Sequence, residues 1–273
     1  MPVNKQRLLA ITFISVLLFS AIAGVQLLDS AKASLAMPEE TINYTITSIN
    51  GSLWAKIDGT YPLQMLFGPG QEYTWDSTSY KVVSGPLALV YPTPPGTTNI
   101  SVSMDDTELS WSNYTEIYPG ILHHTAIGDW SMINSTIYPI PEYFTLKIHY
   151  EHPVMLINGS YTFLYDLNIS PYLSPWSTKS TAHFNIRMET NYTSLRLNTI
   201  APDEALNPIN HTITRDYTAE TIKFQIVSEY SKPLLGDILV TFTTPTTSGA
   251  VEFSYLLIAV SYTHLRAHET VLD

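Results

Sequence analysis

The strongest candidate for chemistry is a group of histidines and a carboxylate in the segment "KIHYEHPV", residues 147–154. His149 and Glu151 are two residues apart, so in a strand their side chains share one face, while His152 points to the other. An imidazole and a carboxylate can bind a divalent metal ion, but one strand face supplies only two such ligands. His123 and His124, in "ILHHTAIGDW", are the candidates to complete the site. These five side chains are therefore the candidates for a metal site.

Two alternatives stay open for the polar clusters. The histidines lack a recognised metal-binding spacing such as His-Glu-x-x-His, which favours a polar strand edge with hydrogen-bonded histidines over a metal site. Asp105, Asp106 and Glu108 lie together in "SMDDTELSW". Such carboxylates can bind calcium in extracellular β-proteins, but the regular calcium-loop pattern is missing, which favours a solvated hairpin turn.

The rest of the chain carries no catalytic signature. There is no Gly-x-Ser-x-Gly elbow and no phosphate-binding loop. The absence of cysteine excludes disulfides, zinc–thiolate sites and thiol catalysis. A net charge of −11 argues against a nucleic-acid partner. We therefore expect no catalytic residue and no cofactor apart from the metal.

The N-terminus has the pattern of an export signal. Lys5 and Arg7 precede an apolar run over residues 8–28, and Ala31 and Ala33 have the small-x-small spacing that a signal peptidase recognises. Cleavage after Ala33 is predicted; the alternative is an uncleaved anchor, because the run is nearly long enough to span a bilayer. Either way we expect the remainder to lie outside the cytoplasm.

The distribution of asparagine agrees with export. Of thirteen asparagines, nine open an Asn-x-Ser/Thr motif, whereas the frequency of Ser and Thr alone would give about three. Asn50 and Asn158 are each followed by glycine between alternating apolar runs, which predicts tight type I′ hairpin turns and makes them poor acceptors. The remaining sites are predicted to carry glycans on the surface: Asn43, Asn99, Asn113, Asn134, Asn168, Asn191 and Asn210.

The elements that must position these residues are strands. Beyond residue 37 the apolar residues recur with a period of two, which is typical of half-buried strands, and no amphipathic helix is evident. Ten strands are predicted, at residues 42–49, 52–58, 87–92, 99–104, 144–151, 161–169, 182–190, 194–200, 221–229 and 237–244. Short strands separated by Pro-rich and Gly-rich breaks predict an all-β fold, an antiparallel β-sandwich of one large or two immunoglobulin-like domains.

The predicted domain organisation follows the breaks in the sequence. We expect a signal peptide or anchor at residues 1–33, a β-sandwich domain at 38–140, and a second sandwich, or the second half of the first, at 141–245. Residues 246–259 are predicted to be a stalk and a truncated apolar segment. The tetrapeptide Ile-Asn-Gly-Ser, at residues 49–52 and 157–160, hints at two similar halves.

The stretch "YPTPPGTTNISVSMDDTELSWSNYTE", followed by "LHHTAIGDW" and "LKIHYEHP", resembles a group of archaeal exported surface proteins. The resemblance covers most of residues 38–200. It implies a β-rich extracellular domain, often held to the membrane by a C-terminal helix. It implies no particular activity, so no functional residue is carried over.

The last residues, 260–273, differ in composition from the rest of the chain, which is rich in Thr and Asn. Read back into codons, "SYTHLRAHET" matches a string that resembles the adapter of transposase-based sequencing libraries. We expect this segment to be an artefact of sequencing, and the natural chain to continue from the apolar run at Phe253 into a membrane-spanning helix. His264 and His268 then have no functional role.

Together these features predict an exported cell-surface glycoprotein with a structural or binding role, with an N-terminal or a C-terminal segment as its candidate membrane anchor. Other cell-surface proteins or glycans are the expected partners. The competing hypothesis is a secreted metal-dependent hydrolase that uses the His123–His124 pair and the cluster at His149, Glu151 and His152. The two classes are distinguished by whether three or more of these side chains meet in a concave site.

Overall fold

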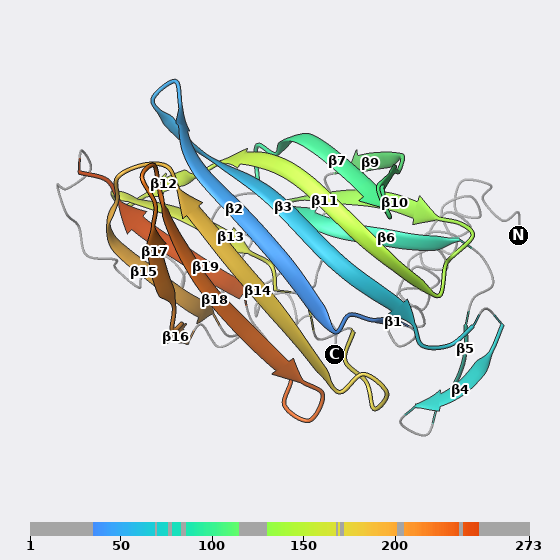
Figure 1. Ribbon diagram of the computed structural model, residues 1–273. Coiled ribbons are helices and arrows are strands. Elements are labelled where there is room, and N and C mark those ends of the chain that lie inside the picture. The colour runs from blue at the N-terminus through green and yellow to red at the C-terminus, as the bar shows by residue number, and fades with distance from the viewer. Residues whose placement is uncertain are drawn as a thin grey trace, which may run out of the picture.

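The computed structural model describes residues 35–68, 70–75, 78–82, 86–114, 130–167, 169, 172–200, 205–234 and 237–245. Strands dominate this part of the chain, as the period of two predicts, and the all-β sandwich is confirmed (Figure 1). None of the described segments is a helix long and apolar enough to cross a membrane. The predicted signal, stalk and C-terminal segments lie outside the described residues.

One layer of the sandwich is a long, mostly antiparallel sheet that runs across the front of Figure 1. Only β14 and β2 pair in parallel, among the strand pairs described. The strand order is β17 (Thr212–Arg215), β18 (Glu220–Glu229), β14 (Lys179–Met188), β2 (Glu39–Ile49), β3 (Ser52–Met65), β11 (Tyr143–Pro153), β7 (Thr98–Met104) and β8 (Thr107–Glu108), with the short β1 (Leu35–Ala36) also paired to β3.

The other layer consists of two smaller sheets behind the long one (Figure 1). The first has the order β6 (Leu87–Thr93), β10 (Ser131–Ile137) and β9 (Trp111–Tyr114). The second has the order β12 (Met155–Ile157), β13 (Ser160–Tyr165), β19 (Asp237–Thr243), β15 (Thr193–Ile200) and β16 (Leu206–Pro208). A separate hairpin joins β4 (Glu72–Trp75) to β5 (Thr78–Lys81).

The two Asn-Gly turns form as predicted. Asn50 and Gly51 have φ angles of 51° and 82° between β2 and β3, and Asn158 and Gly159 have φ angles of 50° and 79° between β12 and β13. Positive φ at both central residues is the type I′ geometry, which matches the right-handed twist of the flanking strands. These turns fix the register of both hairpins.

The larger of two hydrophobic clusters among the described residues lies between the layers. Its members come from the inward faces of β2, β3, β11, β14 and β18 and from β10, β13, β15 and β19. The long sheet combines strands from both sides of residue 140, and β10 and β11 on either side of that residue belong to different layers. A second, smaller cluster centres on Trp130 and Leu164, on the other face of the two small sheets. The described residues therefore pack as one sandwich around a shared core.

Candidate functional site

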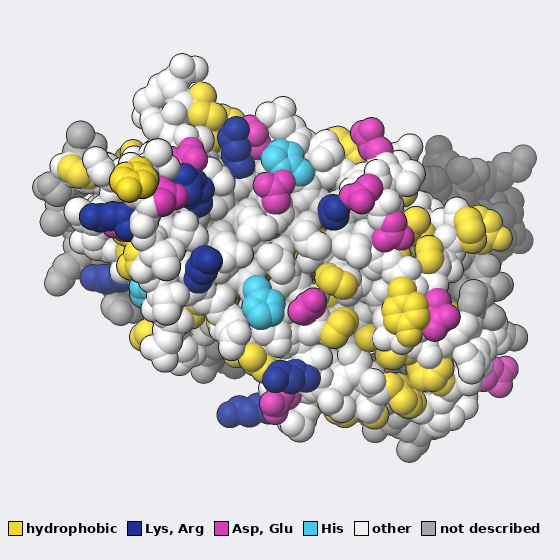
Figure 2. All heavy atoms as spheres, in the orientation of Figure 1, with side chains coloured by type: hydrophobic (Ala, Val, Ile, Leu, Met, Phe, Trp, Pro, Cys, Tyr) yellow, Lys and Arg dark blue, Asp and Glu magenta, His cyan; other side chains and the backbone are white. Residues whose placement is uncertain are grey.

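The strand β11 carries three of the five predicted metal ligands, and its residues alternate strictly between the two faces of the sheet. Its buried positions include Ile148, Tyr150 and His152, while His149 and Glu151 lie on the outer face. The predicted sharing of one face by His149 and Glu151 is confirmed. The outer face of the long sheet, seen in Figure 2, is largely neutral and polar with scattered charges.

The outward side chains of β11 are held by partners on neighbouring strands. His149 Nδ1 lies 2.8 Å from Asp58 Oδ1, directly across on β3. Glu151 forms a 3.4 Å ion pair with Lys56 and accepts a 2.9 Å hydrogen bond from Asn99 Nδ2. His149 Nε2 is 4.0 Å from Glu151 Oε1. These residues form a hydrogen-bonded polar row on a solvated sheet face.

His152 belongs to a different environment. It is 2% exposed, and its Nδ1–H donates a 2.9 Å hydrogen bond to the carbonyl oxygen of Pro153. Its Nε2 has no hydrogen-bond partner among the described residues. Burial lowers the pKa of His152 to about 4, so the ring is neutral at physiological pH. The sheet therefore separates His152 from His149 and Glu151, and the three cannot converge on one ion.

The other predicted metal ligands add no site to the part of the chain that is described. His123 and His124 lie outside the described residues. Within those residues, no group of three or more His, Asp or Glu side chains is placed to hold a metal ion. Asp105 and Asp106 form the tight turn between β7 and β8, with φ angles of 47° and 65°. Asp105 Oδ1 accepts the backbone N–H of Thr145, 2.8 Å away.

The predicted glycan acceptors are mostly accessible. Five of the asparagines are exposed: Asn43, Asn99, Asn113, Asn191 and Asn210. Asn168 lies outside the described residues. Asn134 is half-buried in β10, the central strand of its sheet, and its Oδ1 is buried without a hydrogen-bond partner among the described residues.

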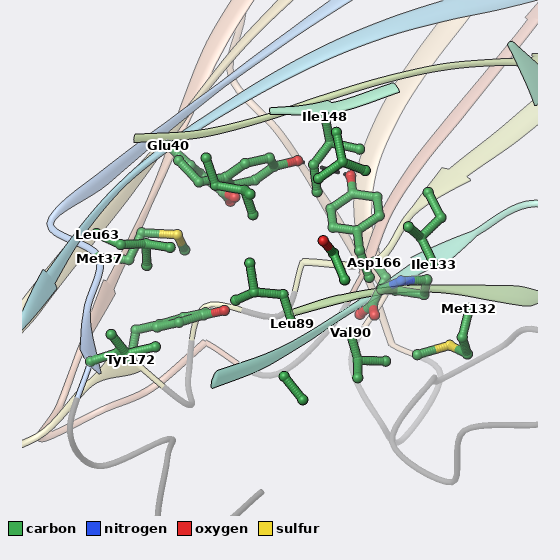
Figure 3. A pocket seen from close by; sticks show the side chains of 18 of the residues that line it. Met37, Glu40, Leu63, Leu89, Val90, Met132, Ile133, Ile148, Asp166 and Tyr172 are labelled. Atoms are coloured by element: carbon green, nitrogen blue, oxygen red, sulfur yellow. Dashed lines mark hydrogen bonds between the residues drawn. The ribbon is translucent and has the colours of Figure 1, made fainter. Parts of the chain in front are cut away.

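A cavity of about 130 Å³ lies between the layers, at the end of the sandwich where the long sheet faces β6 and β10. Figure 3 shows Glu40 and Ile148 from the long sheet on one side and Leu89, Val90 and Ile133 from β6 and β10 on the other. Most of its wall is aliphatic, supplemented by the phenols of Tyr61, Tyr91, Tyr165 and Tyr172. An apolar cavity of about 150 Å³ holds one benzene molecule, so this slightly smaller space matches a ligand of about that size.

Glu40 is the unexpected member of the cavity wall. In β2 it occupies an inward position, in phase with the buried Ile42, Tyr44 and Ile46, and it is 3% exposed. Its Oε2 accepts a 3.3 Å hydrogen bond from the Tyr165 hydroxyl, while its Oε1 has no partner among the described residues. Burial raises the pKa of Glu40 to about 8, because a charged carboxylate is poorly solvated there. The carboxyl is therefore mainly protonated at neutral pH.

A chain of phenols extends from Glu40 across the cavity. Tyr61 donates a 2.9 Å hydrogen bond to the Tyr91 hydroxyl, and the Tyr61 and Tyr165 oxygens are 3.3 Å apart. Burial raises the pKa values of Tyr61, Tyr91 and Tyr165 well above the ordinary value of a phenol, so these side chains stay neutral. A side chain at Gly59 would overlap the ring of Tyr61, so glycine at this inward position of β3 makes room for the phenol.

A second acidic group borders the cavity. Asp166 follows β13 and lines the wall, and it is hydrogen-bonded to Asp237, the first residue of β19. Burial raises the pKa of both carboxyls, and the charge of Asp166 raises that of Asp237 further. Two buried carboxyls in contact share one proton. The pair therefore adds a single negative charge beside the cavity at neutral pH.

These residues were not singled out from the sequence, although one signal was present. In "EETINYTITSI" the alternation places Glu40 on the same face as three apolar residues, and a carboxylate in that phase marks a buried charge. Asp166 and Asp237 carry no such signal, because each lies at a strand end where an acidic residue is common.

No protein-family profile and no curated protein matches this sequence. Among solved structures, the fold is similar to a Legionella pneumophila protein named a nutrient binding protein, with 11% identity, a TM-score of 0.50, and coverage of 86% of this chain and 73% of that one. It also matches a Parabacteroides distasonis protein named a protease (11% identity, TM-score 0.44, coverage 78% and 41%). Leukotriene A4 hydrolase of Saccharomyces cerevisiae matches at 12% identity, TM-score 0.41 and coverage 78% and 32%. At these identities the likeness concerns the fold alone.

Proposed function

We propose that this chain is an exported cell-surface protein whose sandwich binds a small, largely apolar molecule in the cavity between its layers. The observation that carries the proposal is the pairing of the 130 Å³ cavity with Glu40, a residue of its wall whose buried carboxyl has one oxygen without a hydrogen-bond partner among the described residues. A binding site of this kind combines apolar walls with a few polar groups that orient the ligand.

A purely structural role explains Glu40 poorly. Burying a polar group without a hydrogen-bond partner costs about 1–3 kcal/mol, and an apolar residue at this inward position of β2 would avoid that cost. A ligand that forms a hydrogen bond with the unpartnered oxygen removes this free-energy cost when it binds. Glu40 is therefore better explained as a ligand-orienting residue than as part of the core.

Export and glycosylation belong to the same proposal. They are supported by the N-terminal apolar run with its small-x-small motif and by the nine Asn-x-Ser/Thr motifs. Five of the seven favoured acceptors have exposed side chains, which leaves room for a bulky glycan on the folded surface. The name of the Legionella protein agrees with a binding role, although its likeness to this chain is one of fold.

The proposal is tested by filling the cavity. Leu89 lines the cavity from β6, and the L89W substitution places an indole in that space. The L156W substitution on β12 is the matched control, because Leu156 is 56% exposed and lies away from the cavity wall. Binding of a set of small aromatic and aliphatic molecules is measured by saturation-transfer NMR on the full chain.

We expect some of these molecules to bind the parent chain and L156W, and L89W to bind them at least about tenfold more weakly, a loss of about 1.4 kcal/mol. Equal binding by L89W would place the ligand elsewhere, and a complete lack of binding by the parent chain would contradict a binding role for the cavity. Thermal unfolding of L89W reports whether the variant folds.

A further inference from the structure

The groups at the cavity that can carry a full charge near neutral pH are all carboxyls. Glu40 and Asp166 line it, and Asp237 is bound to Asp166. Among the described residues that line the cavity there is no Lys, Arg or His. The whole chain has a net charge of −11, so no wider positive field compensates the carboxyls. The electrostatics of the cavity therefore disfavour an anionic ligand and favour a cation.

The hydrogen-bonding groups point to the same class of ligand. Tyr165 donates to Oε2 of Glu40, which leaves Oε1 without a partner among the described residues and able to accept a hydrogen bond once the carboxyl is ionised. Tyr61 donates its proton to Tyr91, so its oxygen keeps a lone pair for a donor. Phenol rings also attract cations through their π faces. An ammonium group provides three donors and no acceptor, and it matches a carboxylate surrounded by phenol oxygens.

We propose that the cavity binds a small organic cation, a primary ammonium on a compact apolar body, with the ammonium hydrogen-bonded to Glu40. This inference rests on the proposed function and names the ligand class of the same site. A charge-assisted hydrogen bond to the buried carboxylate is about twice as strong as a neutral one, which separates the amine from a neutral ligand of the same shape.

Binding of such a cation is coupled to a proton. The empty site keeps Glu40 mainly protonated, and a neighbouring ammonium favours the ionised form, so the carboxyl releases its proton to solvent as the amine binds. The titratable side chains whose charge or hydrogen bonding couples to Glu40 are Tyr44, Tyr61, Tyr165 and Asp166. The three tyrosines stay neutral, which leaves Asp166 as the only other group of this set that changes charge near neutral pH.

The test compares three probes that share one ring and differ in charge: benzylamine, benzyl alcohol and benzoate. Their affinities for the full chain are measured by calorimetry at pH 7 in two buffers that differ in ionisation enthalpy. The variant is E40Q, which keeps the shape of the side chain and removes its charge. The matched control is E39Q, because Glu39 is the adjacent carboxylate but lies exposed on the outer face of β2.

We expect benzylamine to bind at least about tenfold more tightly than benzyl alcohol, benzoate not to bind, and proton release to accompany benzylamine alone. E40Q should lose the preference for the amine and E39Q should keep it. Equal or tighter binding of benzyl alcohol, or an unchanged preference in E40Q, overturns this inference but leaves the binding role of the cavity. If none of the three probes binds although other small molecules do, the ligand class alone is wrong. If nothing binds, the proposed function fails with it.

Discussion

Replacing Glu40 with glutamine should change how the stability of the protein depends on pH. Burial raises the pKa of Glu40 from its ordinary value of 4.5 to about 8 in the folded protein. Between these two values the folded chain holds a proton that the unfolded chain has lost. The free energy of unfolding therefore falls as pH rises through this range, by about 1.4 kcal/mol per pH unit. Glutamine at this position does not titrate, so the free energy of unfolding of E40Q should not fall with pH for this reason.

The expected magnitude follows from the width of this range. At pH 5 the parent chain and E40Q should have similar stability, because the protonated carboxyl and the amide are nearly isosteric. By pH 8 the variant should have gained about 3–4 kcal/mol relative to the parent. Because domains are stable by only about 5–15 kcal/mol, the effect is large. Other groups with shifted pKa values, such as Asp237 and His152, are present in both proteins and cancel in the difference.

The assay is urea unfolding at pH 5, 6, 7 and 8, followed by tryptophan fluorescence. Trp130 is 3% exposed and reports loss of the core. E39Q is again the matched control, since an exposed carboxylate is solvated in both states and its removal should leave the pH dependence unchanged. If the stability difference between E40Q and the parent chain varies by less than about 1 kcal/mol from pH 5 to pH 8, Glu40 is ionised in the folded protein and the reasoning is refuted.

Three further predictions concern other buried positions. The H152F substitution should make the stability of the protein less dependent on pH in the acid range. The pKa of His152 is lowered from 6.5 to about 4 in the folded protein, so the parent chain loses about 3 kcal/mol of stability as pH falls through that range. A pH series of unfolding curves in which H152F loses as much stability as the parent chain would contradict this. The G59A substitution should lower the free energy of unfolding by about 1–3 kcal/mol, because its methyl group displaces the ring of Tyr61. The control G68A should be nearly neutral in thermal unfolding, because the nearest atom to its added methyl group is 3.8 Å away. Similar melting temperatures for the two variants would show that the Tyr61 ring moves without an energetic cost. Mass spectrometry of native material should find Asn134 unmodified, since its side chain is half-buried in the centre of a sheet, and a glycan there would mean that modification precedes the formation of β10.

The sequence by itself determined the local features of this protein. The period of two located all ten predicted strands, and the Asn-Gly pairs located both tight turns, because alternation and turn chemistry act over a few neighbouring residues. The same rule placed His149 and Glu151 on one face of β11 and His152 on the other. Nine strands were missed, most of them short; several, such as β8 and β17, are exposed and show no apolar alternation.

Only the tertiary structure decided what these elements build. The parallel pairing of β2 with β14 joins segments about 140 residues apart, and which strands pair depends on the burial of the whole chain rather than on either segment. The same packing aligns Asp166 with Asp237 and closes the phenols of Tyr61, Tyr91 and Tyr165 around Glu40. A carboxylate in the apolar phase of a strand is visible in the sequence, but its protonation and its place on a cavity wall depend on how the opposite layer covers it. The long-range pairing of strands therefore makes Glu40, an acidic residue at an apolar position of β2, part of a candidate binding site.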